Sequence, residues 1–124
     1  MGLLTASRTI AIRGAMKAID VEVYWDSGCT DTVSAVNWDI LEPGGSPAKT
    51  IYVKNTGNAP LTLSMTCSGW TPPEAVDHIT LSWDKEGVTV EPNAVVETLL
   101  TLSVSEAIYG ITDFSCTITI EGKG

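Results

Sequence analysis

Apolar residues alternate with polar ones along most of this chain. The alternation covers residues 18–25, 35–40, 50–54, 59–67, 78–83, 96–104 and 112–121. A side-chain period of two is typical of β-strands that bury one face and expose the other to water. Only residues 71–79 and 104–110 have room for a helical turn, and neither is long enough for more. The pattern therefore predicts an all-β protein.

Turn-forming clusters separate these segments. They are EPGGSP at 42–47, NTGNAP at 55–60, DKEG at 84–87 and EPN at 91–93. Glycine can adopt a positive φ and proline lacks an N–H group, so both residues favour turns. Short strands with turns at this spacing predict an antiparallel β-sandwich of the immunoglobulin-like or jelly-roll type.

The first apolar stretch is out of phase with the one that follows it. Its apolar positions have even numbers and the later ones have odd numbers: Leu4, Ala6, Ile10 and Ile12, then Ile19, Val21, Val23 and Trp25. One continuous strand cannot bury both sets on the same side of a sheet. Glycine permits a bend or a hinge, so we predict the break at Gly14. Residues 1–14 would then form a separable strand and hinge, and residues 15–124 the body of the sandwich.

Charge limits the partners that this chain can have. The 124 residues include 7 basic and 15 acidic side chains, which give a net charge of -8. Such a field repels phosphate backbones and anionic lipid headgroups, so we expect no nucleic-acid partner. No apolar run approaches the roughly 18 residues of a membrane-spanning helix, and we expect no membrane span. The start of the chain lacks the apolar centre of a signal peptide, so we expect a cytosolic or an already processed chain.

The cysteines and the acidic loop offer weak candidates for chemistry. Cys29, Cys67 and Cys116 include no CxxC pair, which argues against zinc-ribbon and redox motifs. Cys67 and Cys116 share the parity of apolar neighbours and are predicted to point into the core, while a disulfide that involves Cys29 remains open. Asp26 and Asp31 could bind calcium, but they lack the EF-hand spacing. A turn that caps its own backbone is the favoured interpretation of this loop.

Neither catalysis nor sugar binding is favoured. His78 is the single histidine, and no GxSxG or HExxH motif is present, so we expect no enzyme, metal or cofactor. Exposed tryptophan rings can stack on sugars, yet Trp25, Trp38 and Trp83 lie on the apolar side of their strands. Only Trp70, in a predicted loop, is free to take another orientation.

Six segments, in order along the chain, carry a family resemblance. They are RTIAIRG at 8–14, VYWDSGCT at 23–30, NWDILEPGG at 37–45, YVKNTGNAPLTLS at 52–64, ITLSW at 79–83 and GITDFSCTITIEG at 110–122. Taken together they resemble the bundling pilins of hyperthermophilic archaea, relatives of the bacterial biofilm protein TasA and of camelysin. The likeness covers essentially the full length.

The resemblance implies a secreted structural subunit of an extracellular filament, whose secretion signal we expect to have been removed. Subunits of this kind join by donor-strand complementation, and their filaments bundle and support adhesion or biofilm formation. The donor positions would be Leu4, Ala6, Ile10 and Ile12, with Gly14 as the hinge. The acceptor groove would be formed by Ile19, Val21, Val23, Phe114, Ile118 and Ile120.

Two alternatives remain at this point. The first is a monomeric immunoglobulin-like binding or adhesion module, whose first strand folds back onto its own sheet. The second, less favoured, is a camelysin-like peptidase, for which the sequence offers no metal-ligand set.

Overall fold

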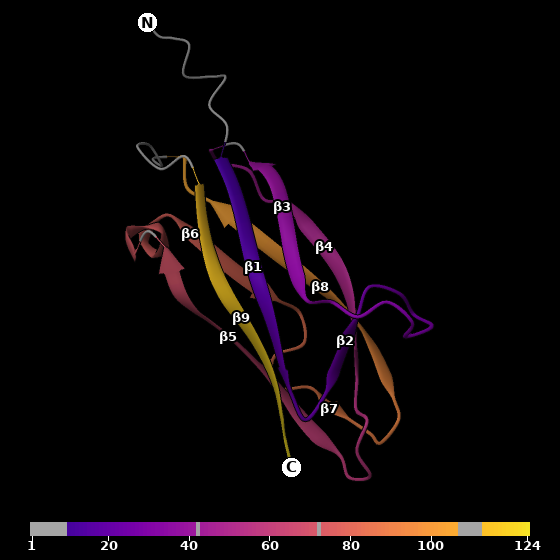
Figure 1. The fold of residues 1–124 in the computed structure, drawn as a ribbon. Coiled ribbons are helices and arrows are strands. Elements are labelled where there is room, and N and C mark those ends of the chain that lie inside the picture. The colour runs from indigo at the N-terminus through magenta and orange to yellow at the C-terminus, as the bar shows by residue number, and fades with distance from the viewer. Residues whose placement is uncertain (1–9, 42, 72, 107–112) are drawn as a thin grey trace, which may run out of the picture.

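A computed structural model describes residues 10–41, 43–71, 73–106 and 113–124, without the side chains of residues 10–13, 39–41, 74 and 113. The elements follow one another along the chain as shown in Figure 1. They are β1 (Ile10–Ile19), β2 (Glu22–Tyr24), β3 (Ala35–Leu41), β4 (Ala48–Lys54), β5 (Leu61–Thr71), the 3-10 helix η2 (Pro73–Asp77), β6 (Ile79–Trp83), β7 (Thr89–Val90), β8 (Val95–Val104) and β9 (Asp113–Lys123). The predicted helical turn within 71–79 is confirmed as η2, whereas most of 104–110 lies outside the described residues.

The strands form two sheets that pack face to face (Figure 1). One sheet has the order β3-β1-β9-β5-β7 and the other the order β2-β4-β8-β6. The predicted all-β sandwich is therefore confirmed. The prediction of purely antiparallel pairing is wrong for one pair, because β1 runs parallel to β9 from Ala11 opposite Asp113 to Ile19 opposite Glu121. These two strands are not joined by a hairpin, so their connection does not impose an antiparallel direction.

The core lies between the sheets and is built from the inward positions of the alternating strands. Its fully buried members include Val36, Ile51, Val53, Leu63, Leu100, Leu102, Ile118 and Ile120. Two polar residues of the described ranges are also fully buried, Thr98 on β8 and Asn55 just after β4. Asn55 Nδ2 donates to the carbonyls of Ala59 at 2.7 Å and Val90 at 3.0 Å, and its Oδ1 accepts from Gly57 N at 2.9 Å. These bonds satisfy the amide and fix the turn that follows β4.

The change of apolar phase lies at Asp20 and not at Gly14. β1 continues through Gly14, which is buried, and Met16 two residues later packs against the core. A Cβ atom at position 14 would lie 2.7 Å from Ile118 Cδ1, so this glycine permits close contact between β1 and β9. Asp20 has a φ of 63°, and Val21 beyond it is buried with the opposite parity. The residue at the bend therefore lies in the turn between β1 and β2.

Trp70 lies within β5, so the prediction that it belongs to a loop is wrong. The β5·β9 register shifts between Ser68 and Thr71, and Gly69 has a φ of 66°. A bulge of this kind adds residues to one strand while the pairing continues. It turns the Trp70 side chain toward the core, where its ring centroid lies 6.4 Å from that of Phe114.

Candidate functional site

The candidate site is one long side of the sandwich, where edge strands of the two sheets face each other. We call it the open flank and define it as residues Met65–Thr71 of β5 and Ile79–Trp83 of β6. On the side away from β9, β5 pairs with β7 only at Leu61 and Thr62, and Leu63 N then donates to Val88 O at 2.9 Å. Beyond these contacts, no strand in the described ranges lies along the edge. β6 pairs with β8 and with no other described strand.

Large apolar side chains line the open flank and are only partly buried. They are Met65, Cys67, Trp70, Leu81 and Trp83, all of which pack against the core. Leu63 and Ile79, at the neighbouring inward positions of the same strands, are 1% and 2% exposed. The burial of both strands is therefore incomplete along the side where their edges lack partners.

Glu86 holds one end of the open flank together. Its Oε1 accepts hydrogen bonds from Met65 N at 3.1 Å and from Trp83 Nε1 at 2.8 Å. One carboxylate thus connects a β5 backbone group to a β6 side chain across the two sheets. It also occupies the N–H group with which a further strand would pair.

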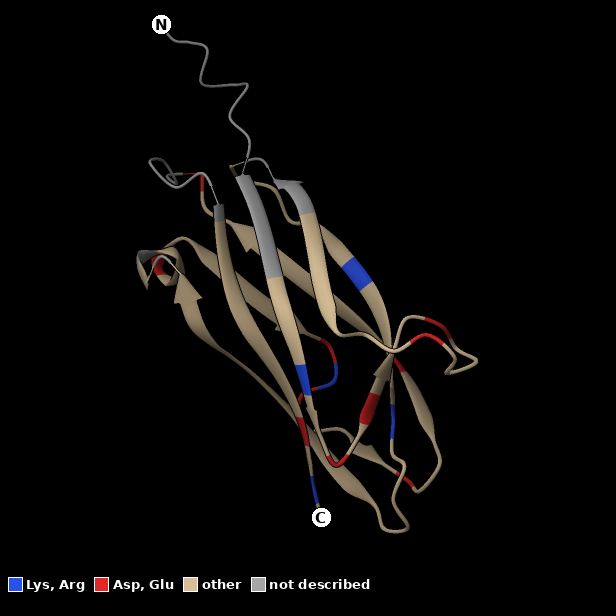
Figure 2. Ribbon diagram, viewed as in Figure 1, with Lys and Arg blue, Asp and Glu red and all other residues tan. Residues whose placement is uncertain are grey.

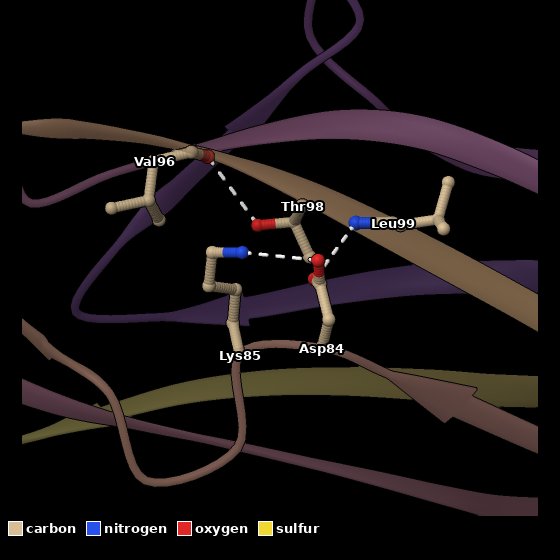
Figure 3. Close-up of polar contacts among 5 residues, drawn as sticks. All are labelled: Asp84, Lys85, Val96, Thr98 and Leu99. Carbon is tan, nitrogen blue, oxygen red and sulfur yellow. Dashed lines mark hydrogen bonds and ion pairs between the residues drawn. The ribbon is translucent and has the colours of Figure 1, made fainter.

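Asp84 lies in the same turn as Glu86, residues 84–87, and hydrogen bonds this turn to the four-stranded sheet (Figure 3). Its Oδ1 accepts from Leu99 N at 3.0 Å, just beyond the point where β6 stops pairing with β8. Lys85 Nζ lies 3.1 Å from Asp84 Oδ2. The hydrogen bond from Leu99 N–H, and then the contact with Lys85, lower the pKa of Asp84 below its ordinary value. The two carboxylates of the turn at residues 84–87 therefore tie the end of β6 to Met65 within β5 and to Leu99 within β8.

The strands of the open flank contain no charged residue within their described bounds, as the segments LTLSMTCSGWT and ITLSW show. Acidic and basic residues lie mostly in the turns and near strand ends (Figure 2). Proteins commonly place charges, above all lysine, on exposed edge strands to prevent pairing with another chain. The absence of charge along β5 and β6 leaves their edges without this protection.

The acceptor residues predicted from the sequence belong to the core of their own chain. Five of them are buried and Ile19 is half-buried; the five are Val21, Val23, Phe114, Ile118 and Ile120. β9 already has β1 on one side and β5 on the other, so these residues form no open groove in this conformation. Their role as an acceptor in an assembly, which would require β1 to leave its place beside β9, stays a prediction.

The predicted donor positions lie at the limit of the described residues. Leu4 and Ala6 are outside them, and so are the side chains of Ile10 and Ile12, although both residues belong to the backbone of β1. Gly14 makes no bend in this chain, and a hinge role in an assembly stays a prediction.

The acidic loop forms the capped turn that the sequence favoured. Asp26 Oδ1 accepts from the backbone N–H groups of Thr30 at 2.9 Å and Asp31 at 3.0 Å, and the Thr30 hydroxyl donates to Oδ2. The hydrogen bond from the Thr30 hydroxyl is the main cause that lowers the pKa of Asp26. Throughout the described ranges, no group of three His, Cys, Asp or Glu residues could hold a metal ion.

The remaining sequence predictions concern the thiols and the histidine. Cys116 is 5% exposed, as predicted, whereas Cys67 is only half-buried on the open flank. His78 is half-buried between η2 and β6, where its backbone N donates to Ala75 O at 3.0 Å.

Sequence reasoning missed the open flank and the bridging role of Glu86. The one available signal was the position of Glu86 within the DKEG turn, three residues after Trp83. That signal does not say which strands are edges, because the order of strands in a sheet depends on the whole fold.

Comparison with known proteins adds no relative to this description. No protein-family model and no curated protein matches the chain. None of the helices in the part of the chain that the structure describes is long and apolar enough to span a membrane.

Proposed function

We propose that this protein is a structural subunit of an extracellular filament, a pilin, in which a strand donated by one subunit completes the sandwich of the next. The single observation that carries the proposal is the open flank, where unpaired strand edges border half-buried apolar side chains. An added strand would pair with the backbone of β5 and cover this lining at the same time. Such a subunit has no need of a catalytic site, so we do not assign an enzymatic activity.

The donor in this proposal is the segment before β1. Residues 3–9, LLTASRT, have apolar side chains at Leu4 and Ala6 that alternate as a strand requires. This segment has as many residues as the β5 edge from Met65 to Thr71. Residues from Ile10 onward are paired with β3 and β9 of their own chain, so donation of Ile10 and Ile12 would require β1 to unpair.

Charge and burial both favour the pairing of these two segments. Arg8 is the only charged side chain of residues 3–9, and it would approach a subunit of net charge -8. Covering the exposed part of one large apolar side chain stabilises by about 1 kcal/mol. The four large ones on the flank are Met65, Trp70, Leu81 and Trp83, and their burial, together with the backbone hydrogen bonds of an added strand, opposes the entropy lost when the donor segment becomes ordered.

The contact is head to tail, because the donor segment and the acceptor flank are different surfaces of the same subunit. A contact of this type that does not close on itself generates an open filament. The extracellular location, the lateral bundling of filaments and the immunoglobulin-like or jelly-roll type of the sandwich rest on the resemblance to archaeal bundling pilins.

Disulfide crosslinking between differently marked subunits tests the proposal. In a cysteine-free background of the full chain, one population carries Ala6→Cys and the other carries Met65→Cys on the open flank. We expect crosslinked dimers when the two are mixed, and filaments of the unmodified protein in negative-stain micrographs. Ala35→Cys, an exposed position on β3, is the matched control and should not crosslink.

Two results would redirect the proposal. Crosslinking of Ala6→Cys to Ser115→Cys on β9 of another subunit would favour the acceptor predicted from the sequence. A chain that carries both Ala6→Cys and Met65→Cys, and crosslinks only within itself at high concentration, would contradict strand donation.

A monomeric binding module is the second candidate, and one observation favours it. β1 already lies within the sheet of its own chain, paired on both sides. A monomer predicts a sedimentation coefficient independent of protein concentration, whereas a strand-donating subunit predicts growth of polymers as concentration rises.

A further inference from the structure

Two of the three cysteines lie on adjacent strands and on the same face of one sheet. Cys67 of β5 is directly opposite Ile118 of β9, and Cys116 precedes Ile118 by two residues. Because the side-chain period of a strand is two, Cys116 and Ile118 point to the same side, and Cys116 is a diagonal neighbour of Cys67. Neither thiol is engaged in a disulfide, and the register of β5 against β9 shifts just beyond Cys67, between Ser68 and Thr71.

The two thiols differ in exposure and in acidity. Cys67 is half-buried at the open flank, whereas Cys116 is 5% exposed beneath it. The hydrogen bond from Cys116 lowers the pKa of Cys67, and the same contact, together with burial, raises the pKa of Cys116. The more accessible thiol is therefore also the one that ionises more readily, and the thiolate is the reactive form.

We propose that Cys67 and Cys116 are an oxidisable pair that closes into an intrachain disulfide between β5 and β9. A low-molecular-weight disulfide such as oxidised glutathione is the oxidant. The Cys67 thiolate attacks one sulfur of this reagent, forms a mixed disulfide and releases one reduced thiolate. Cys116 then loses its proton, attacks Cys67 Sγ and releases the second thiolate, so that two protein thiols are oxidised as one reagent disulfide is reduced to two thiols.

Cys29 takes no part in this pair. It lies in the turn between β2 and β3, and this turn is on the side of the sandwich opposite β5 (Figure 1). A bond from Cys29 to either other thiol would require the turn to cross the whole domain. The pairing is therefore fixed by position, and Cys29 provides an internal control.

The experiment compares the full-length protein after incubation with oxidised glutathione and with dithiothreitol. We expect the oxidised monomer to lose the mass of two hydrogen atoms, to keep one thiol that reacts with iodoacetamide, and to yield a peptide that links Cys67 to Cys116. The melting temperature should rise on oxidation and return on reduction.

Variants separate the two steps. Cys29→Ser should form the same bond, whereas Cys116→Ala should stop at a glutathione adduct on Cys67. Mapping of the unsubstituted protein keeps the proposal testable even if a variant fails to fold. Retention of all three thiols, or a link that involves Cys29, would overturn it.

Discussion

Tryptophans lie on both long sides of the sandwich, but the described residues cover only one of these sides. On the side of β2 and β3, the segment after β2 folds back over the edge, where Trp25 N donates to Asp31 O at 2.7 Å and Val33 N to Val23 O at 2.9 Å. Trp38 of β3 is 4% exposed on this side, and Lys49 Nζ lies 5.8 Å from the centroid of its ring. On the open flank, Trp83 is only partly buried.

The edge strands of the two sides also differ in charge. Within β2 and β3 the sequence includes Glu22 and Asp39, whereas β5 and β6 contain no charged residue. Charges on an edge oppose pairing with another chain. The covered side therefore has charged edge strands, and the open flank, to which we propose that a further strand is added, has none.

The comparison predicts unequal costs for removing two tryptophans. Trp38→Ala should lower the free energy of unfolding by about 3 to 5 kcal/mol, because it leaves a cavity under a covered side. Trp83→Ala should cost about half as much, since its ring is already partly in water. Denaturant unfolding at constant protein concentration measures both, and equal costs would show that the two sides are packed alike.

Assembly should respond to a charge in the donor segment while the fold does not. We expect Leu4→Asp to weaken polymerisation at least about 100-fold, because an unpaired carboxylate would be buried against the open flank. The matched control Thr5→Asp adds the same charge at a position of the opposite parity and should assemble. Sedimentation and thermal unfolding measure the two properties, and normal polymers of Leu4→Asp would argue against the donor role.

A substitution at Gly14 distinguishes a role in close packing of β1 against β9 from a role as a hinge. Gly14→Ala should destabilise the monomer by about 1 to 3 kcal/mol, because its Cβ would collide with the Ile118 side chain. Gly28→Ala, which meets its nearest neighbour at 3.5 Å in an exposed turn, is the control and should cost less. A neutral effect of Gly14→Ala on thermal unfolding would indicate that β1 is not held against β9 in solution.

Glu86 should affect fold and assembly in opposite directions. Glu86→Ala removes the acceptor shared by Met65 N and Trp83 Nε1, so we expect the monomer to lose about 1 kcal/mol. The same change frees the Met65 N–H for an incoming strand, and polymers should therefore form at lower protein concentration. Glu86→Gln retains an acceptor oxygen and should resemble the unsubstituted protein, whereas reduced polymerisation of Glu86→Ala would contradict the proposed acceptor.

The smallest predicted effect is the pH dependence of the stability that Asp84 contributes, in the turn that also contains Glu86. The pKa of Asp84 is lowered in the folded chain, so its contribution to stability is complete above the unfolded value of about 3.9 and is lost as pH falls through the folded value. Asp84→Asn should reduce stability at pH 7 by about 0.5 kcal/mol, because the group is exposed and screened by solvent. The difference should vanish near pH 2 in thermal unfolding, and a difference that grows toward low pH would reverse the assignment.

Local patterns were sufficient to predict most of the strands and several of the turns, although β7 was missed and the predicted strand of residues 18–25 is divided between β1 and β2. The alternation around Ile51, Leu100 and Ile118 predicted strands with buried inward positions, because the side-chain period depends only on backbone geometry. The Asp26 loop was predicted to cap its own backbone, since its hydrogen bonds join residues close in sequence. The phase break itself was detected correctly, although it was assigned to Gly14 when the backbone changes direction at Asp20.

Tertiary structure alone decided which strands became neighbours. Backbone N–H and C=O groups are the same in every strand, so no local pattern could show that β1 runs parallel to β9, or that β6 and most of β5 border an uncovered side of the sandwich. The contact of Cys67 with Cys116 and the double role of Glu86 follow from that order, because each joins residues from strands or turns that pack together only in the complete fold. The sequence by itself determined which residues could lie inward, and the packing of the whole sandwich determined which of them were left at an uncovered edge.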